Sequence, residues 1–135
     1  MALDITQRER EGVVILDMKG RLKAGDEATA FRDKIAEVVQ GGVQQLVANL
    51  EGVDYIDSTG LGALVVSAMS LRKNSGNMKL LKLNRRNIEL LVMTKLATVF
   101  EIFNDEQDAV NSYYPDRKIK TFDILDFVQQ MKKSE

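Results

Sequence analysis

The stretch from Val53 to Leu64 constrains the fold of this chain more than any other. It reads VDYIDSTGLGAL, so an apolar run ends in Asp57, Ser58 and Thr59 before two glycines and renewed apolar residues. Asp, Ser and Thr are preferred at helix N-caps because their side-chain oxygens accept hydrogen bonds from backbone N–H groups that lack helical partners. The pattern predicts a buried strand that delivers Ser58 to the start of a helix, where a negatively charged phosphate is tolerated.

Strands and helices are predicted to alternate along the chain. Short apolar runs predict strands at 3–10, 13–19, 46–50, 78–83 and 98–103, the first two forming a hairpin around Glu11 and Gly12. Apolar residues at helical spacing predict helices at 26–40, from Ser58 onward, at 87–94 and at 105–114. The alternation predicts an α/β fold with a mixed central sheet covered by helices.

A boundary is expected at Pro115, the only proline. We expect residues 1–114 to form one domain and residues 115–135 to form a C-terminal extension with an amphipathic helix. Thr121 is the expected N-cap of this helix, whose apolar face carries Ile124, Phe127, Val128 and Met131. That face suits packing on its own domain, a homodimer contact or a partner groove, and we expect packing on its own domain.

Composition narrows the classes of function. The 19 Lys and Arg against 20 Asp and Glu give a formal net charge of −1, so electrostatics does not favour nucleic acid or an anionic membrane as the partner, and we expect a protein. The chain has no Cys and no His, which removes thiol nucleophiles and the usual general base, so we expect no enzyme activity, metal or cofactor. With no leader and no apolar run long enough to cross a bilayer, a cytoplasmic location is expected.

One basic cluster, Lys79, Lys82, Arg85 and Arg86, is compatible with a phosphate or nucleic-acid site. No aromatic residues are interleaved with these four side chains, whereas sites for single-stranded nucleic acid usually combine both types. We therefore interpret the cluster as solvated side chains.

Four segments occur in the order VVILDMKGRL, VANLEGVDYIDSTGLGAL, GNMKLLKLNRRNIELL and TVFEIFNDEQDAV. Over roughly Asp4 to Tyr114 the chain thereby resembles the bacterial anti-sigma-factor antagonists built on the STAS domain, and DSTGLG is the most specific part of the match. The resemblance implies that Ser58 accepts a phosphoryl group from an anti-sigma factor that is itself an ATP-dependent serine kinase. It also implies partner switching: the unphosphorylated antagonist captures this kinase and frees a sigma factor, and a serine phosphatase resets the phosphorylated form.

The expected phosphosite is therefore the turn at Asp57. Ser58 is the expected acceptor and Thr59 the competing one, while Asp57, Thr59, Gly60 and Gly62 are expected to shape the turn. For both glycines the main expected role is close packing at the helix start, since glycine permits close backbone approach.

A partner surface is expected around the same turn, formed by Arg21, Lys23, Asp26, Ser58 and Leu61. Two positions depart from what the resemblance implies. Relatives commonly carry acidic or small polar residues near Arg21 and Lys23, so these two charges leave the identity of the cognate partner open. Relatives also usually have glycine at the position of Lys95, where a positive φ is often required, so a strained or altered turn is expected there.

Alternatives come from other classes of protein. A phosphate-accepting receiver domain needs an acidic pair after its first strand, but here Asp17 is followed by Met18 and Lys19. A serine hydrolase needs a base near Ser58, yet the chain has no histidine, no GxSxG motif and no clear SxxK set. The stronger alternative is a STAS module that acts as a non-phosphorylated scaffold or transporter-associated subunit, which a failure of kinase modification would distinguish.

Overall fold

A five-stranded mixed sheet forms the centre of the protein in the computed structural model, which describes residues 3–134 and only the backbone of 131–134. The strands lie side by side in chain order, β1 (Asp4–Arg10), β2 (Val13–Leu22), β3 (Gln45–Ile56), β4 (Asn77–Leu81) and β5 (Ile102–Phe103). The β1 and β2 strands pair antiparallel, and every later pair is parallel. The predicted mixed α/β fold is confirmed.

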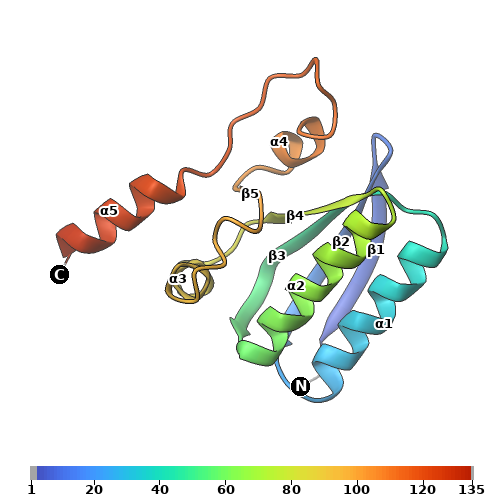
Figure 1. Ribbon diagram of the computed structural model, residues 1–135, viewed down its shortest axis with the longest axis horizontal. Coiled ribbons are helices and arrows are strands. Elements are labelled where there is room, and N and C mark those ends of the chain that lie inside the picture. The colour runs from blue at the N-terminus through green and yellow to red at the C-terminus, as the bar shows by residue number, and fades with distance from the viewer. Residues whose placement is uncertain (1–2, 135) are drawn as a thin grey trace.

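The helices are α1 (Asp26–Gln40), α2 (Ser58–Lys73), α3 (Arg85–Met93), α4 (Glu106–Asn111) and α5 (Ile124–Ser134). Figure 1 shows α1 and α2 side by side across the sheet, while α4 lies near β5. Successive residues of a strand point to opposite faces, so Leu16 of β2 joins the larger core with Phe31 and Leu64, whereas Ile15 joins a smaller core with Val110 of α4. The α1 and α2 helices thus cover one face and α4 covers part of the other.

The predicted hairpin turns at Glu11 and Gly12. Both residues have positive φ, 51° and 84°, as a two-residue type I′ turn requires. The Tyr114 hydroxyl donates a hydrogen bond to the Glu11 carbonyl, and Arg117 forms an ion pair with the Glu11 carboxylate at 2.8 Å. The segment that follows α4 is therefore fastened to the N-terminal hairpin.

The last predicted strand is mostly wrong. Of residues 98–103 only Ile102 and Phe103 form β5, where they pair with Leu80 and Leu81, because the chain before them is bent into a turn. The preceding residues form a turn in which the Val99 N–H donates to the Leu96 carbonyl at 3.0 Å.

The extension carries the predicted helix, but its cap differs. Asp123, not Thr121, caps α5, because the Asp123 carboxylate accepts a hydrogen bond from the Asp126 N–H at 3.0 Å. The Phe122 N–H donates to the Ile102 carbonyl at 3.0 Å, and Phe122, Ile124 and Phe127 pack against the larger core. The expected packing on the same chain is thus present, whereas the Met131 side chain lies outside the described part.

The turn after α3 contains the expected unusual residue. Lys95 has a φ of 63°, and the hydrogen bonds from Lys95 N–H to Val92 and from Leu96 N–H to Leu91 form the helix ending that usually employs glycine. A lysine with positive φ is strained by its Cβ atom.

Across residues 3–134, no helix combines the length and the apolar character that crossing a membrane requires.

Candidate functional site

Asp57 organises the turn that presents Ser58. One carboxylate oxygen accepts a hydrogen bond from the Gly60 N–H at 2.8 Å, which caps α2. The other accepts from the Ala24 N–H at 2.9 Å, and the Asp57 N–H itself donates to the Leu22 carbonyl at 3.2 Å. A single side chain therefore holds the start of α2 and the loop after β2 in a fixed relation.

The surroundings of Asp57 keep it ionised. Burial raises the pKa of this carboxyl, but the N–H groups of Ala24, Gly60 and Thr59, together with the charge of Lys23, outweigh that effect and hold the pKa below its ordinary value. The cap is thus a carboxylate at neutral pH.

Ser58 is the first residue of α2, and its side chain is exposed. Thr59 is exposed as well, so accessibility alone allows either hydroxyl to react. Within residues 3–134 neither hydroxyl forms a hydrogen bond to another residue. Both oxygens are therefore free to accept a phosphoryl group without breaking an existing contact.

The two glycines of the turn differ. A Cβ atom on Gly60 would lie 2.8 Å from the carbonyl carbon of Leu22 and even closer to its oxygen, so the expected close packing is confirmed for Gly60. Apart from its chain neighbours and the adjacent backbone of α2, a Cβ atom on Gly62 would meet no described atom within 4 Å, so the same expectation is wrong for Gly62. The second glycine faces open space.

Leu61 does not fit the partner surface that was expected to include it. Its side chain is only 3% exposed and belongs to the larger core, because it follows Gly60 on the inward face of α2. The outward face carries Ser58, Gly62, Val66 and Met69, spaced three or four residues apart, and Val66 and Met69 are each 59% exposed. This set, which we call the α2 outer face, replaces Leu61 as the accessible part of the helix.

The loop residues expected at the partner surface lie close to the turn. Arg21 is still part of β2, where it is exposed and lies opposite Tyr55 of β3. Lys23 is half-buried near Asp57, and Asp26 is the exposed first residue of α1. The hydrogen bond from Ala24 to Asp57 brings this loop beside Ser58.

A shallow hollow of about 420 Å³ lies beside Ser58. One wall is formed by Ser58 and the residues that precede it, and the other by the side of α3 that carries Arg86, Glu89, Leu90 and Met93. The sequence analysis predicted this helix but not its position beside Ser58.

Two asparagines fix α3 against β3. The Asn87 side chain, only 1% exposed, donates to the Val53 carbonyl at 3.1 Å, and the Asn84 side chain donates to the Asp54 carbonyl at 3.2 Å. Asn84 also caps α3 by accepting from the Asn87 N–H at 2.8 Å. The spacing of Asn84 and Asn87 was a signal for the cap, but the bonds to β3 required the structure.

The four residues of the basic cluster differ in their exposure and in their contacts. Lys79 is buried, only 6% exposed, with its ammonium 4.5 Å from the Tyr113 ring and 2.7 Å from a Glu101 oxygen, so the solvated interpretation is wrong for it. Arg86 is exposed, yet its guanidinium stacks 4.2 Å from the ring centre of Tyr55. An aromatic partner therefore accompanies Arg86 in space although not in sequence.

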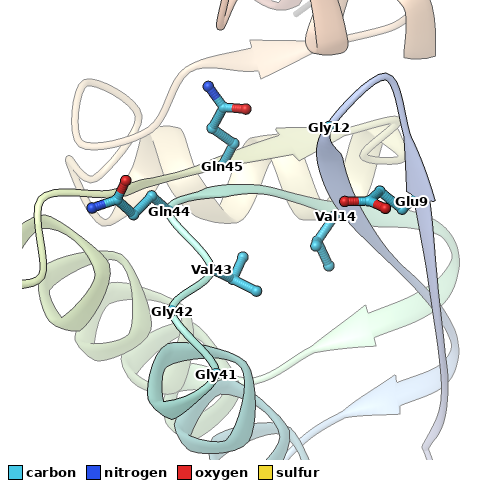
Figure 2. A pocket seen from close by; sticks show the side chains of 8 residues that line it. All are labelled: Glu9, Gly12, Val14, Gly41, Gly42, Val43, Gln44 and Gln45. Atoms are coloured by element: carbon cyan, nitrogen blue, oxygen red, sulfur yellow. The ribbon is translucent and has the colours of Figure 1, made fainter.

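A second hollow, of about 460 Å³, lies at the opposite end of β3 (Figure 2). It is lined by residues 41–45 together with Glu9, Gly12 and Val14. Glu9 is the single ionisable side chain in this lining, so the second hollow lacks the group of charged side chains that lies near Ser58.

Comparison with known proteins agrees with this arrangement. The family model of the STAS domain matches residues 4–109. The Anti-sigma-B factor antagonist of Bacillus subtilis (strain 168) is 28% identical over 102 residues, which span 76% of this chain and 92% of that protein.

Solved structures show the same fold. An anti-sigma factor antagonist from Mycobacterium paratuberculosis has a TM-score of 0.73 at 22% identity, covering 82% of this chain and 92% of its own. The anti-sigma factor antagonist SpoIIAA in its unphosphorylated form has a TM-score of 0.63 at 20% identity, covering 83% of this chain and 99% of its own. With a family match that spans most of its length, this chain belongs to the STAS domain family.

Proposed function

We propose that this protein is an anti-sigma-factor antagonist that binds an anti-sigma-factor serine kinase while Ser58 is unmodified and is released when Ser58 is phosphorylated. The observation that carries the proposal is the free, exposed hydroxyl of Ser58 at the start of α2 in a STAS domain. The relative from Bacillus subtilis is named an anti-sigma-B factor antagonist. SpoIIAA, which shares the fold, is known in both unphosphorylated and phosphorylated forms, so this fold accommodates a phosphate.

The proposed switch acts through charge at the partner surface. Phosphorylation adds about −1.5 to −2 charges, here next to the ionised Asp57. The Asp57 hydrogen bonds to Gly60 and Ala24 do not involve the Ser58 hydroxyl, so the turn keeps its shape. A like-charge contact or a desolvation cost of about 3 kcal/mol in the complex would weaken binding by about two orders of magnitude.

The partner surface consists of the α2 outer face and the loop that carries Lys23 and Asp26. Val66 and Met69 are large apolar side chains that remain exposed, which suits a protein partner rather than a small ligand. In this proposal the protein is a substrate and a binding module in the cytoplasm, without a cofactor, that regulates transcription by freeing a sigma factor. A serine phosphatase resets it.

Phosphorylation is tested by incubating the protein, ATP and magnesium with an anti-sigma-factor kinase from the same genome and measuring intact mass with site localisation. We expect one phosphoryl group at Ser58, none on Ser58→Ala, and normal modification of the control Thr59→Ala. Modification of Thr59 alone would show that Thr59, not Ser58, is the phosphoacceptor. No modification by a kinase that is active on its own substrate would favour the non-phosphorylated scaffold or transporter-associated module.

Partner capture is tested by binding of the same kinase to variants of Ser58. Because Asp57 supplies the cap, Ser58→Ala should fold and bind like the wild type. Ser58→Asp, which adds one negative charge, should weaken binding about tenfold or more while leaving the unfolding midpoint unchanged. Equal affinity of both variants would contradict the switch.

We also propose that residues 1–114 are the STAS domain and that residues 115–135 are an extension that packs on it rather than forming a homodimer. The bond between Phe122 and Ile102 and the apolar packing of Ile124 and Phe127 support this division. Sedimentation of the full chain at micromolar concentration should then give the mass of a monomer. If the wild type forms a stable dimer and Leu125→Ala restores the monomer, the exposed side of α5 mediates self-association instead.

A further inference from the structure

We propose that the hollow beside Ser58 is an internal phosphate-binding site in which Arg86, stacked on Tyr55, pairs with the phosphate on Ser58 of the same chain. This proposal rests on the phosphorylation of Ser58 proposed above and adds how the phosphorylated form is stabilised. The site would take a phosphate monoester dianion carried by the chain itself.

Ser58 and Arg86 line the same hollow from opposite elements. Ser58 stands at the start of α2, whereas Arg86 stands in the first turn of α3. The guanidinium of Arg86 lies 4.2 Å from the ring centre of Tyr55, which lines the hollow as well. Stacking of this kind holds the guanidinium plane while its N–H donors stay available at the edge, and that edge matches the oxygens of a phosphate.

Arg86 differs from its basic neighbours because it has no acidic partner. Arg85 forms an ion pair with Glu89 at 3.0 Å, and Lys82 forms one with Glu51 at 3.2 Å. In the described part of the chain, Arg86 forms neither an ion pair nor a hydrogen bond. Its positive charge is therefore available to a ligand of the hollow.

The remaining charges of the hollow make such a cation necessary. Asp57 and Glu89 both line it, so a phosphate dianion would enter beside two carboxylates. Asp57 is engaged by backbone N–H groups and Glu89 by Arg85, which leaves Arg86 to balance the added charge. Arg21 lies next to this site, in an adjoining hollow of about 290 Å³ that it shares with Asp54, Tyr55 and Arg86.

The position of Arg86 does not depend on the phosphate. The side chains of Asn84 and Asn87 tie the start of α3 to the carbonyls of Asp54 and Val53, directly before Tyr55 in β3. The start of α3, which carries Arg86, is therefore held beside Tyr55 before any phosphate is added. The phosphate would be held on the α3 side of the turn while the kinase loses its contact with the α2 outer face.

The experiment installs phosphoserine at position 58 genetically, so it needs no kinase, and follows the second ionisation of the phosphate by phosphorus NMR. A nearby guanidinium favours the dianion, so we expect its pKa to lie below the value of about 6 that is usual for phosphoserine. Arg86→Gln should raise that pKa by about 0.5 unit, the order expected for one charge about 5 Å away at a surface.

Lys82→Gln is the control, because Lys82 is paired with Glu51 and neither of these residues lines the hollow. It should leave the phosphate pKa within about 0.1 unit of the parent value, since a solvent-accessible and already paired charge acts weakly at a distance. Equal values for the parent and Arg86→Gln would overturn the proposal. A shift produced by Arg21→Gln and not by Arg86→Gln would also overturn it.

The two proposals fail in different ways. If the kinase modifies Ser58 but Arg86→Gln leaves the phosphate pKa unchanged, the internal site is wrong and the switch stands. If the pKa shift is present but no anti-sigma-factor kinase modifies Ser58, the internal site stands and the proposed function is wrong. Unfolding of the unphosphorylated Arg86→Gln variant at the parent's denaturant midpoint verifies that the substitution leaves the fold intact.

Discussion

The two sides of the first turn of α2 obey different requirements. On the inward side, Gly60 and Leu61 are buried against Leu22 and the core, so the fold itself explains both residue types. On the outward side, Gly62 touches nothing that would exclude a larger residue, although glycine within a helix costs about 1 kcal/mol relative to alanine. The contrast teaches that the inward side is set by packing, whereas the outward side keeps a residue that packing does not need.

The largest effect should come from the inward side. Gly60→Ala would push a methyl group into the carbonyl of Leu22, which belongs to backbone and cannot rotate away. We expect a loss of stability of about 3 kcal/mol or a failure to fold, as for severe overpacking. Urea unfolding followed by circular dichroism measures it, and a wild-type midpoint would show that the inward contact is loose.

Asp57→Ala should cost about 1 to 2 kcal/mol, the usual range for loss of an N-cap, because both the helix start and the link to Ala24 are lost. The folded pKa of Asp57 is lowered, so its contribution is present above the unfolded pKa of about 3.9 and is lost as the pH falls through the folded pKa. The difference between the urea midpoints of the two proteins should therefore narrow below about pH 4. A difference that stays constant down to about pH 2.5 would mean that the carboxylate charge is unimportant.

Lys95→Gly should stabilise the protein by about 1 kcal/mol, because glycine removes the Cβ strain at positive φ. The side chain is exposed and forms no ion pair among the described residues. Thermal unfolding measures the change, and affinity for the kinase should be unaltered. This variant tests stabilisation at a position outside the α2 outer face.

Gly62→Ala should also stabilise the protein, by about 0.5 to 1 kcal/mol, because alanine is the better helix former and the space is open. If a partner approaches the α2 outer face closely, the same methyl group should weaken kinase binding about tenfold. Lys95→Gly is the control for stability alone. Unchanged binding by Gly62→Ala would show that the partner leaves room at this glycine.

Local patterns predicted the parts of the fold that depend on neighbours in sequence. The hairpin at Glu11 and Gly12 and the helix start at Asp57 were predicted because turn and cap chemistry operates over a few residues. The positive φ of Lys95 was instead expected from the glycine that relatives have at this position. The apolar run before Asp57 likewise predicted a buried strand, although β3 continues without a break from Gln45 to Ile56.

Parts that depend on distant partners were not predictable in the same way. The run that ends in Phe103 has strand-like residues, but a turn after α3 leaves only its last two positions paired with β4. Leu61 was expected at the partner surface but is buried, and Gly62 was expected to pack closely but faces open space. Which side of α2 faces the core depends on contacts with distant residues, such as that between Gly60 and Leu22. The hollow with Arg86 depends on side-chain bonds from α3 to carbonyls about thirty residues earlier.

The backbone hydrogen bond from Phe122 to Ile102 lets the extension shield the edge of the sheet at β5, a role that is separate from signalling. The β5 strand is one of the two edges of the sheet, with β1 at the other, and exposed edges allow other chains to add strands. Residues 115–121 link α4 to the segment that carries Phe122. They are exposed and, after the turn near Pro115, have no regular secondary structure. Proteolytic nicking there would uncover the edge at β5, and the first property to suffer would be colloidal stability in concentrated solution.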